Sequence, residues 1–129
     1  MPVYETANSI VYKPIVVYYR LAAEQIPIRG PLSLKALIVS DIHSNIEAFQ
    51  SVVDDATRQG GFDEIWSLGD LIGYGPDPGA VIGLLRQHEH KAVIGNHDLA
   101  SIDKLSLEAF NPYAKAANLW NGKQLTSDE

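Results

Sequence analysis

Three short apolar segments, each running directly into a polar cluster, constrain the fold of this chain more than any other feature. They cover residues 36–40, 64–68 and 91–94, and each has the length and apolar character of a buried strand. Helical patterns fill the intervals between them, so strands alternate with helices along the sequence. This alternation predicts an α/β fold with parallel strands and right-handed crossovers.

Turn residues and apolar periodicity predict three helices. Gly60 and Gly61 end the first, since glycine is a common helix stop. Asp77-Pro78 and Asn111-Pro112 supply a cap and a first turn for the other two. Their predicted core faces are Ile46, Phe49, Val52, Val53 and Ala56, then Val81, Ile82, Leu84 and Leu85, and finally Tyr113, Ala116, Ala117 and Trp120. Trp66 is also expected in the core.

The composition is that of an ordinary globular protein, with 46% hydrophobic and 20% charged residues and a formal net charge of −6. No run of Lys and Arg forms the basic patch that a nucleic acid would require. The absence of cysteine excludes disulfides, zinc-thiolate sites and cysteine nucleophiles, and suits a cytoplasmic location. Apolar runs are too short to span a bilayer, so no membrane is expected.

Residues 1–34 differ from the rest of the chain. They contain four scattered prolines, Pro2, Pro14, Pro27 and Pro31. Prolines at this spacing break a long helix and disfavour a central strand. Residues 11–19 have the pattern of an edge strand, although no partner for it is evident. We expect residues 1–34 to be an extension, either flexible or not native to the domain, and residues 35–129 to be the domain itself.

Each predicted strand ends in polar residues that seldom follow a buried strand. These residues are Asp41 and His43 after the first strand, Asp70 after the second, and Asn96, His97 and Asp98 after the third. In an open parallel sheet, the carboxyl ends of the strands share one edge, and ligands bind there. Taken singly, each cluster has an ordinary explanation as a helix cap or a turn. Their placement on three successive strand ends predicts one common site.

Carboxylate, imidazole and amide donors without thiols suit Mn²⁺, Fe, Zn²⁺ or Mg²⁺. Asp70, in the middle cluster, can bridge two such cations, and cation pairs of this kind bind phosphate esters. Asp41 and His43 would complete the ligands of the first metal, and Asn96 would bind the second metal.

His97 would face the substrate as a catalytic proton donor, with Asp98 as the catalytic residue that orients it. Tyr74, in the loop after Asp70, has two open interpretations, packing within the loop and contact with a substrate.

The stretches DIHSN (41–45), GDLIGYGPDP (69–78) and GNHD (95–98) together resemble the calcineurin-like metallophosphoesterase family, in particular small bacterial members with a GYGPDP loop. The resemblance covers roughly residues 35–121. It implies an αββα sandwich, of which this chain would form the N-terminal half. It also implies hydrolysis of a phosphomonoester or phosphodiester at a dinuclear metal centre.

Carried over by the resemblance, Asp41 and His43 bind the first metal, Asp70 bridges, Asn96 binds the second metal, and His97 assists catalysis. Family members then supply a further lone His and a G-H-x-H motif as metal ligands. No histidine follows His97 here. We therefore expect a domain truncated at its C-terminus that holds one metal well rather than two.

The alternative is a non-catalytic fragment that binds a metal or a partner. The sheet face that the missing half would cover is expected to favour self-association.

Overall fold

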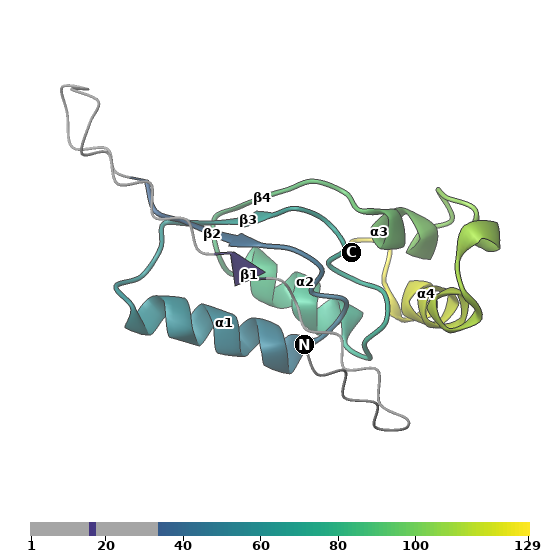
Figure 1. Cartoon of the computed structure of the whole chain (residues 1–129), viewed down its shortest axis with the longest axis horizontal. Coiled ribbons are helices and arrows are strands. Elements are labelled where there is room, and N and C mark those ends of the chain that lie inside the picture. The colour runs from purple at the N-terminus through teal and green to yellow at the C-terminus, as the bar shows by residue number, and fades with distance from the viewer. Residues whose placement is uncertain (1–15, 18–33) are drawn as a thin grey trace, which may run out of the picture.

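The computed structural model describes residues 16–17 and 34–129, in which helices cover one face of a small sheet (Figure 1). The strands are β1 (Val16–Val17), β2 (Ala36–Val39), β3 (Glu64–Ser67) and β4 (His90–Ala92). The helices are α1 (Ile46–Arg58), α2 (Pro78–Arg86), α3 (Asn96–Ser101) and α4 (Pro112–Gln124), with a short 3-10 helix at Leu107–Ala109.

The sheet has the order β1-β2-β3-β4, with β2, β3 and β4 parallel and β1 antiparallel to β2. Helices α1 and α2 are the crossovers between the parallel strands, so the predicted α/β fold is confirmed. The register pairs Val39 with Ser67 and Ser67 with Ala92. The carboxyl ends of the three parallel strands are therefore level, and the segments that follow them start from one edge.

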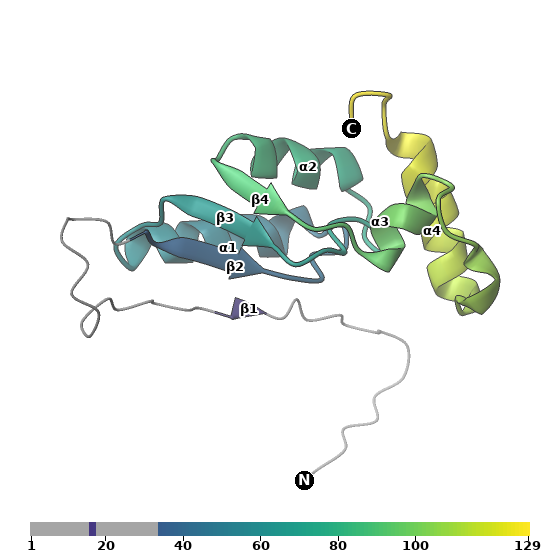
Figure 2. The same cartoon turned by 90° about the horizontal axis from the view of Figure 1, so that it is seen from above.

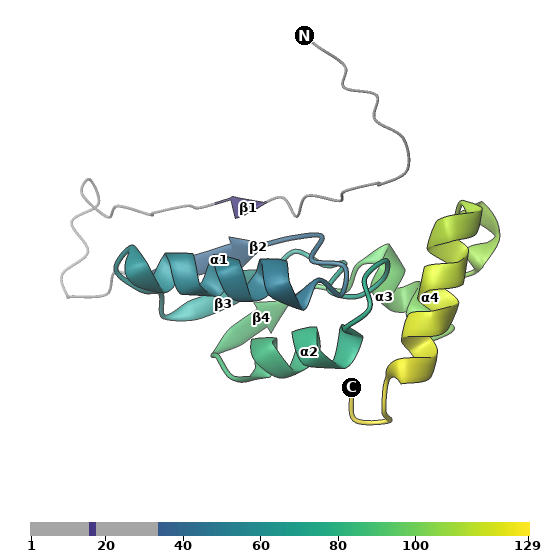
Figure 3. The ribbon, with the colours of Figure 1, turned by 90° about the horizontal axis from the view of Figure 1, so that it is seen from below.

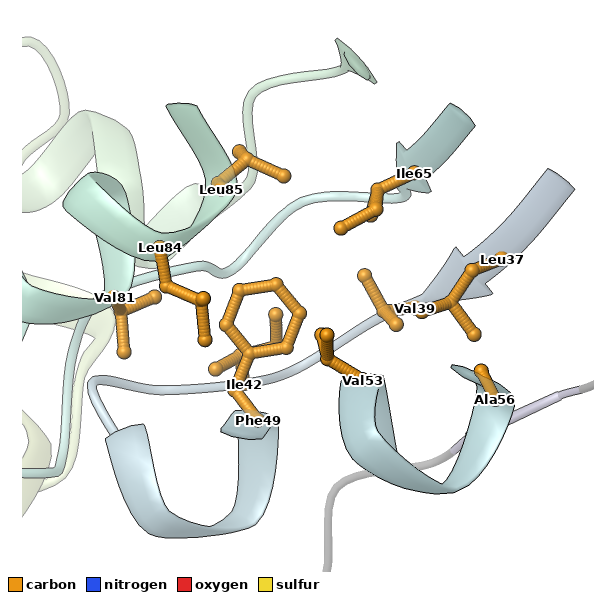
Figure 4. Packing of buried hydrophobic residues seen from close by; sticks show 10 residues of the cluster. All are labelled: Leu37, Val39, Ile42, Phe49, Val53, Ala56, Ile65, Val81, Leu84 and Leu85. Atoms are coloured by element: carbon orange, nitrogen blue, oxygen red, sulfur yellow. The ribbon is translucent and has the colours of Figure 1, made fainter. Parts of the chain in front are cut away.

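The core lies between the sheet and the two helices, which run side by side across one face of the sheet (Figure 3). Figure 4 shows its members, which are Leu37, Val39, Ile42, Phe49, Val53, Ala56, Ile65, Val81, Leu84 and Leu85. Burying a large apolar side chain stabilises a fold by roughly 1.5–3 kcal/mol. This packing fixes the strand ends that carry the polar clusters.

The opposite face of the sheet is covered by none of the described helices (Figure 2). Trp66 lies on β3 half-buried, so its predicted place in the core is wrong. Its indole Nε1 donates to Glu64 Oε2 at 2.7 Å, and the Lys91 Nζ lies 5.3 Å from the ring centroid. Lys91 also pairs with Glu64 at 2.9 Å. Self-association through this face stays a prediction.

Helix α4 buries a different face from the one that periodicity predicts. Tyr113 is 77% exposed and Trp120 is 44% exposed, whereas Ala114, Asn118 and Asn121 are buried. The prediction of a core face at Tyr113 and Trp120 is therefore wrong. A hydrophobicity pattern cannot identify a face whose buried residues are amides with hydrogen-bond partners in neighbouring segments.

The predicted extension falls mostly outside the described residues. Its two described strand residues form β1, where Val16 lies opposite Val39 and Val17 opposite Ile38. The expected edge strand thus has β2 as its partner at these positions. Among the described helices, none combines the length and the apolar character that a membrane span requires.

Candidate metal centre

The polar clusters that follow β2, β3 and β4 meet at one edge of the sheet. The backbone N–H of Asp41 donates to the Gly69 carbonyl at 3.2 Å, and that of His43 donates to the Asp70 carbonyl at 3.0 Å. The backbone N–H of His97, in the first turn of α3, donates to Asp70 Oδ1 at 2.9 Å. Asp70 therefore lies between the other two clusters and is hydrogen-bonded to both.

Three side chains form the tightest group of possible metal ligands in the described residues. One ligand atom from each of His43, Asp70 and His97 lies within 4.8 Å of the other two. Asp41 lies next to this group, because its Oδ1 is 3.6 Å from His43 Nε2. Asn96, predicted as a ligand of the second metal, is the exposed first residue of α3.

The backbone at this edge adopts conformations that side chains ordinarily avoid. Asp41, His43, Ser44 and Asp70 have φ values of +55°, +51°, +56° and +53°. Among the described residues that are not glycine, only Asp103 shares this left-handed conformation. Each such residue costs on the order of 1 kcal/mol and persists only where its surroundings hold it. Strain gathered at four neighbouring polar residues is typical of a functional site.

The ring of His43 is oriented by the loop that follows β3. Its Nδ1 lies 3.2 Å from the carbonyl oxygen of Ile72. A carbonyl oxygen only accepts, so Nδ1 carries the proton and the neutral ring has its lone pair on Nε2. That lone pair and the Asp41 carboxylate are then two electron-rich groups 3.6 Å apart. This pairing, with Asp70 beside it, fits a divalent cation bound by nitrogen and oxygen ligands.

His97 is buried within a cluster of rings. Its ring centroid lies 4.7 Å from that of His43, 4.8 Å from Tyr74 and 5.0 Å from Phe110. Burial lowers the pKa of His97 below its ordinary value, and the neighbouring His43 lowers it further, while the Asp70 carboxylate partly opposes both. The imidazole of His97 is therefore favoured in its neutral form. Tyr74 packs on both histidines, so packing and contact with a substrate both stay predictions for this residue.

Asp98 holds the loop that carries Asp70. Its Oδ2 accepts the backbone N–H groups of Asp70 at 2.9 Å and Gly95 at 2.8 Å, and its Oδ1 accepts that of Ile72 at 3.1 Å. A carboxylate that binds three backbone N–H groups fixes the course of a loop, because each bond to a charged acceptor is strong. The predicted action of Asp98 on His97 stays a prediction.

Sequence reasoning missed two residues of α4 that contact the site. Asn121 is fully buried, and its Oδ1 accepts from the Ser44 hydroxyl at 2.5 Å and from the Gly73 N–H at 3.2 Å. Its Nδ2 donates to the Gly73 and Gly75 carbonyls. Asn118, also fully buried, contacts the His97 ring. Two asparagines three residues apart, inside a helix that neither of them caps, are the signal that points to these contacts.

We expect the metal-free chain to lose stability as the pH falls below 6.5, the ordinary pKa of histidine. Because folding lowers the pKa of His97, the unfolded chain binds a proton more readily than the folded chain in this range, and acid favours unfolding. Above the ordinary pKa both states are neutral and the effect vanishes. Thermal melts in chelator from about pH 7.5 to about pH 5 measure it. Equal pH slopes for the original chain and for His97→Gln would contradict the expectation.

Comparison with known proteins gives consistent matches. A family model described as "Calcineurin-like phosphoesterase" matches residues 34–128. An uncharacterized protein of Methanocaldococcus jannaschii is 40% identical over 91 residues, which cover 70% of this chain and 37% of the relative. A symmetrical bis(5'-nucleosyl)-tetraphosphatase of Haemophilus ducreyi is 31% identical over 64 residues, which cover 48% of this chain and 24% of the relative.

A crystal structure of a metallophosphoesterase from Sphaerobacter thermophilus superposes with a TM-score of 0.59 and 46% identity. The match covers 74% of this chain and 38% of that one. The chain thus spans well under half the length of these relatives.

Proposed function

The chain belongs to the calcineurin-like phosphoesterase family, and on that premise we propose that its strand-end site binds divalent metal ions and hydrolyses a phosphate ester. The observation that carries this proposal is the pairing of His43 Nε2 with Asp41 Oδ1 at 3.6 Å, beside Asp70. The Nε2 of a neutral His43 and the Asp41 carboxylate offer one nitrogen and one oxygen donor, at the edge where parallel sheets bind ligands.

Asp41, His43 and Asp70 would hold the first metal ion, and Asp70 would be shared with a second ion bound by Asn96. Mn²⁺, Fe, Zn²⁺ and Mg²⁺ all suit these donors. When bound, such ions supply positive charge for the phosphate oxygens and lower the pKa of water. The second ion has only Asp70 and Asn96 as protein ligands among the described residues, so we propose that one ion is held well.

His97 would act at the leaving oxygen of the ester, donating to it from a ring N–H. Its position supports this role, since His97 is buried, bonded through its backbone to Asp70, and 4.7 Å from the His43 ring. Asp98 would act one step further away, by fixing the loop that carries Asp70. His97 and Asp98 are thus the proposed catalytic and positioning residues.

The substrate class stays at the level of phosphate esters. One relative is a tetraphosphatase by name, so a dinucleoside tetraphosphate is the first specific substrate to test beside aryl phosphates. The relatives are much longer than this chain, and we propose that its residues 35–129 form one part of such a phosphoesterase. An extension over residues 1–34 and a cytoplasmic location stay predictions.

Metal titration by calorimetry tests the proposal. We expect about one tightly bound Mn²⁺ or Zn²⁺ per chain, with the heat of binding falling at low pH because the histidine must be neutral. Hydrolysis of an aryl phosphodiester should be weak for the chain alone. It should rise when the remaining portion of a close relative is supplied in trans. Two tight sites in the chain alone would show that the ligands are assigned wrongly. Metal binding without hydrolysis in the reconstituted pair would favour a non-catalytic metal-binding fragment.

A further inference from the structure

The amide of Asn118 is the only described side chain of α4 that contacts the His97 ring by a hydrogen bond. Its Nδ2 lies 3.1 Å from His97 Nδ1 and donates to the Ala114 carbonyl at 2.9 Å. Its Oδ1 accepts from the Ser101 hydroxyl at 2.9 Å. Asn118 is 0% exposed and His97 is 7% exposed, so water does not compete for these bonds.

The Ala114 carbonyl decides how the amide of Asn118 is oriented. A carbonyl oxygen only accepts, so the group facing it must be the NH₂ of the side chain. The same NH₂ has a second hydrogen, and this hydrogen faces His97 Nδ1. A ring nitrogen that accepts a hydrogen bond carries no proton itself, so the proton of the neutral imidazole is on Nε2.

We propose that Asn118 is a positioning residue that, by donating to Nδ1, places the ring proton of His97 on Nε2. His97 then presents Nε2–H as a hydrogen-bond donor to an oxygen of the bound phosphate ester. The role of this donor toward a substrate rests on the proposed function. The position of the proton does not, because it follows from contacts within the chain.

His43 and His97 are thereby held as opposite tautomers, although the centroids of their rings are only 4.7 Å apart. The Ile72 carbonyl holds the proton of His43 on Nδ1, which leaves Nε2 as the donor atom for a metal. Asn118 holds the proton of His97 on Nε2, so this nitrogen has no lone pair with which to bind a metal. On this proposal His43 is the metal ligand and His97 the donor to the substrate, although both belong to one group of possible ligands.

The position of Asn118 is itself fixed by the helix around it. Asn121, three residues further along α4, is bonded to the Gly73 and Gly75 carbonyls in the loop after β3. Ser101, at the end of α3, holds the oxygen of the Asn118 amide. With the helix anchored at Asn121 and the amide anchored at Ser101, the NH₂ of Asn118 has one orientation toward His97.

Nitrogen-15 NMR of the full chain tests the proposal without any assay of activity. The chain has four histidines, so a sample labelled at histidine gives a spectrum that single substitutions can assign. Measurements in chelator at about pH 8, above the ordinary histidine pKa, report the neutral rings. We expect His97 to carry its proton on Nε2 and His43 to carry its proton on Nδ1. A proton on Nδ1 of His97 in the original chain would overturn the proposal.

Asn118→Asp supplies a second, independent measurement. A carboxylate accepts where the amide donates, so the His97 tautomer ratio should shift toward Nδ1–H by about tenfold or more. Asn118→Leu removes the donor without adding an acceptor, and should leave a mixture of both forms. Asn111→Asp is the matched control, because it makes the same change at the N-cap of the same helix, where aspartate is equally suitable.

The His43 signal is an internal reference in every sample. Its Nδ1 proton should persist in both Asn118 variants, because the contact with Ile72 is untouched. An unchanged His97 tautomer in a folded Asn118→Asp chain would show that Asn118 only fills space, and would also overturn the proposal. If the variants unfold, the original chain still decides the question. Absence of hydrolysis in the reconstituted pair, together with the two opposite tautomers in the chain, would refute the proposed function and leave this inference standing.

Discussion

Replacing Asp70 with asparagine is expected to lower the affinity of the chain for Mn²⁺ or Zn²⁺ by at least about 100-fold and to remove hydrolysis in a reconstituted pair. The substitution removes the negative charge that both proposed ions share. It keeps the shape of the side chain, and its amide oxygen can still accept from the His97 backbone N–H. Asparagine also tolerates the φ of +53° at this position. The loss would therefore be electrostatic rather than a result of unfolding.

Titration calorimetry of Asp70→Asn beside Asp77→Asn measures this effect. Asp77 is a matched control because it lies in the same loop, at the N-cap of α2, where its side chain makes no capping hydrogen bond. Asparagine caps a helix as well as aspartate does. Equal losses in the two variants would mean that the charge of the loop as a whole, not a ligand at position 70, governs metal binding.

Gly95→Ala is expected to destabilise the fold by about 3 kcal/mol or more. Gly95 has a φ of −91°, which any residue can adopt, so its conformation does not require glycine. The constraint is steric, because an added Cβ would collide with the carboxylate and the backbone nitrogen of Asp70. The loop after β3 or the start of α3 would have to move. We therefore expect weaker metal binding together with a lower melting temperature.

Gly83→Ala is the matched control for Gly95→Ala. Gly83 lies inside α2 and has no atom within 4 Å of the position that a Cβ would occupy. Alanine there should stabilise the chain by roughly 0.5–1 kcal/mol through its higher helix propensity. Urea melts of the two variants should therefore move in opposite directions. A Gly95→Ala chain as stable as the original would show that the segments around Asp70 and Gly95 are not tightly packed.

The parallel sheet and its crossover helices could be predicted from sequence because they rest on local patterns. The apolar run ending at Val39 and the helical period of α1 depend on neighbours a few residues away. The third strand is less regular, and the structure places it at His90–Ala92 rather than at 91–94. The short helix α3 was not predicted, since six residues are too few to show a helical period. His90 begins β4, at the opposite end of the strand from the site.

The position of α4 could not be predicted, because it depends on contacts between segments far apart in the sequence. Apolar periodicity favoured Trp120, yet the helix packs through Asn118 and Asn121. A buried amide is costly unless its donors and acceptor are satisfied. Asn121 meets this requirement with the Ser44 hydroxyl and with backbone groups of the loop after β3. A single sequence does not show which distant groups would bond to these amides, so apolar periodicity indicated the wrong face of the helix.

The four left-handed residues at the site also restrict how it can be redesigned. A library that varies the proposed ligands Asp41, His43 and Asp70 would normally sample every residue type. Valine, isoleucine and threonine are poor choices at all three positions, because a branched Cβ clashes with the backbone at a φ near +55°. Asparagine, aspartate, histidine and glycine tolerate this conformation best. A search for altered metal preference would therefore start from these few residue types, because the backbone conformation restricts the choice before any metal is considered.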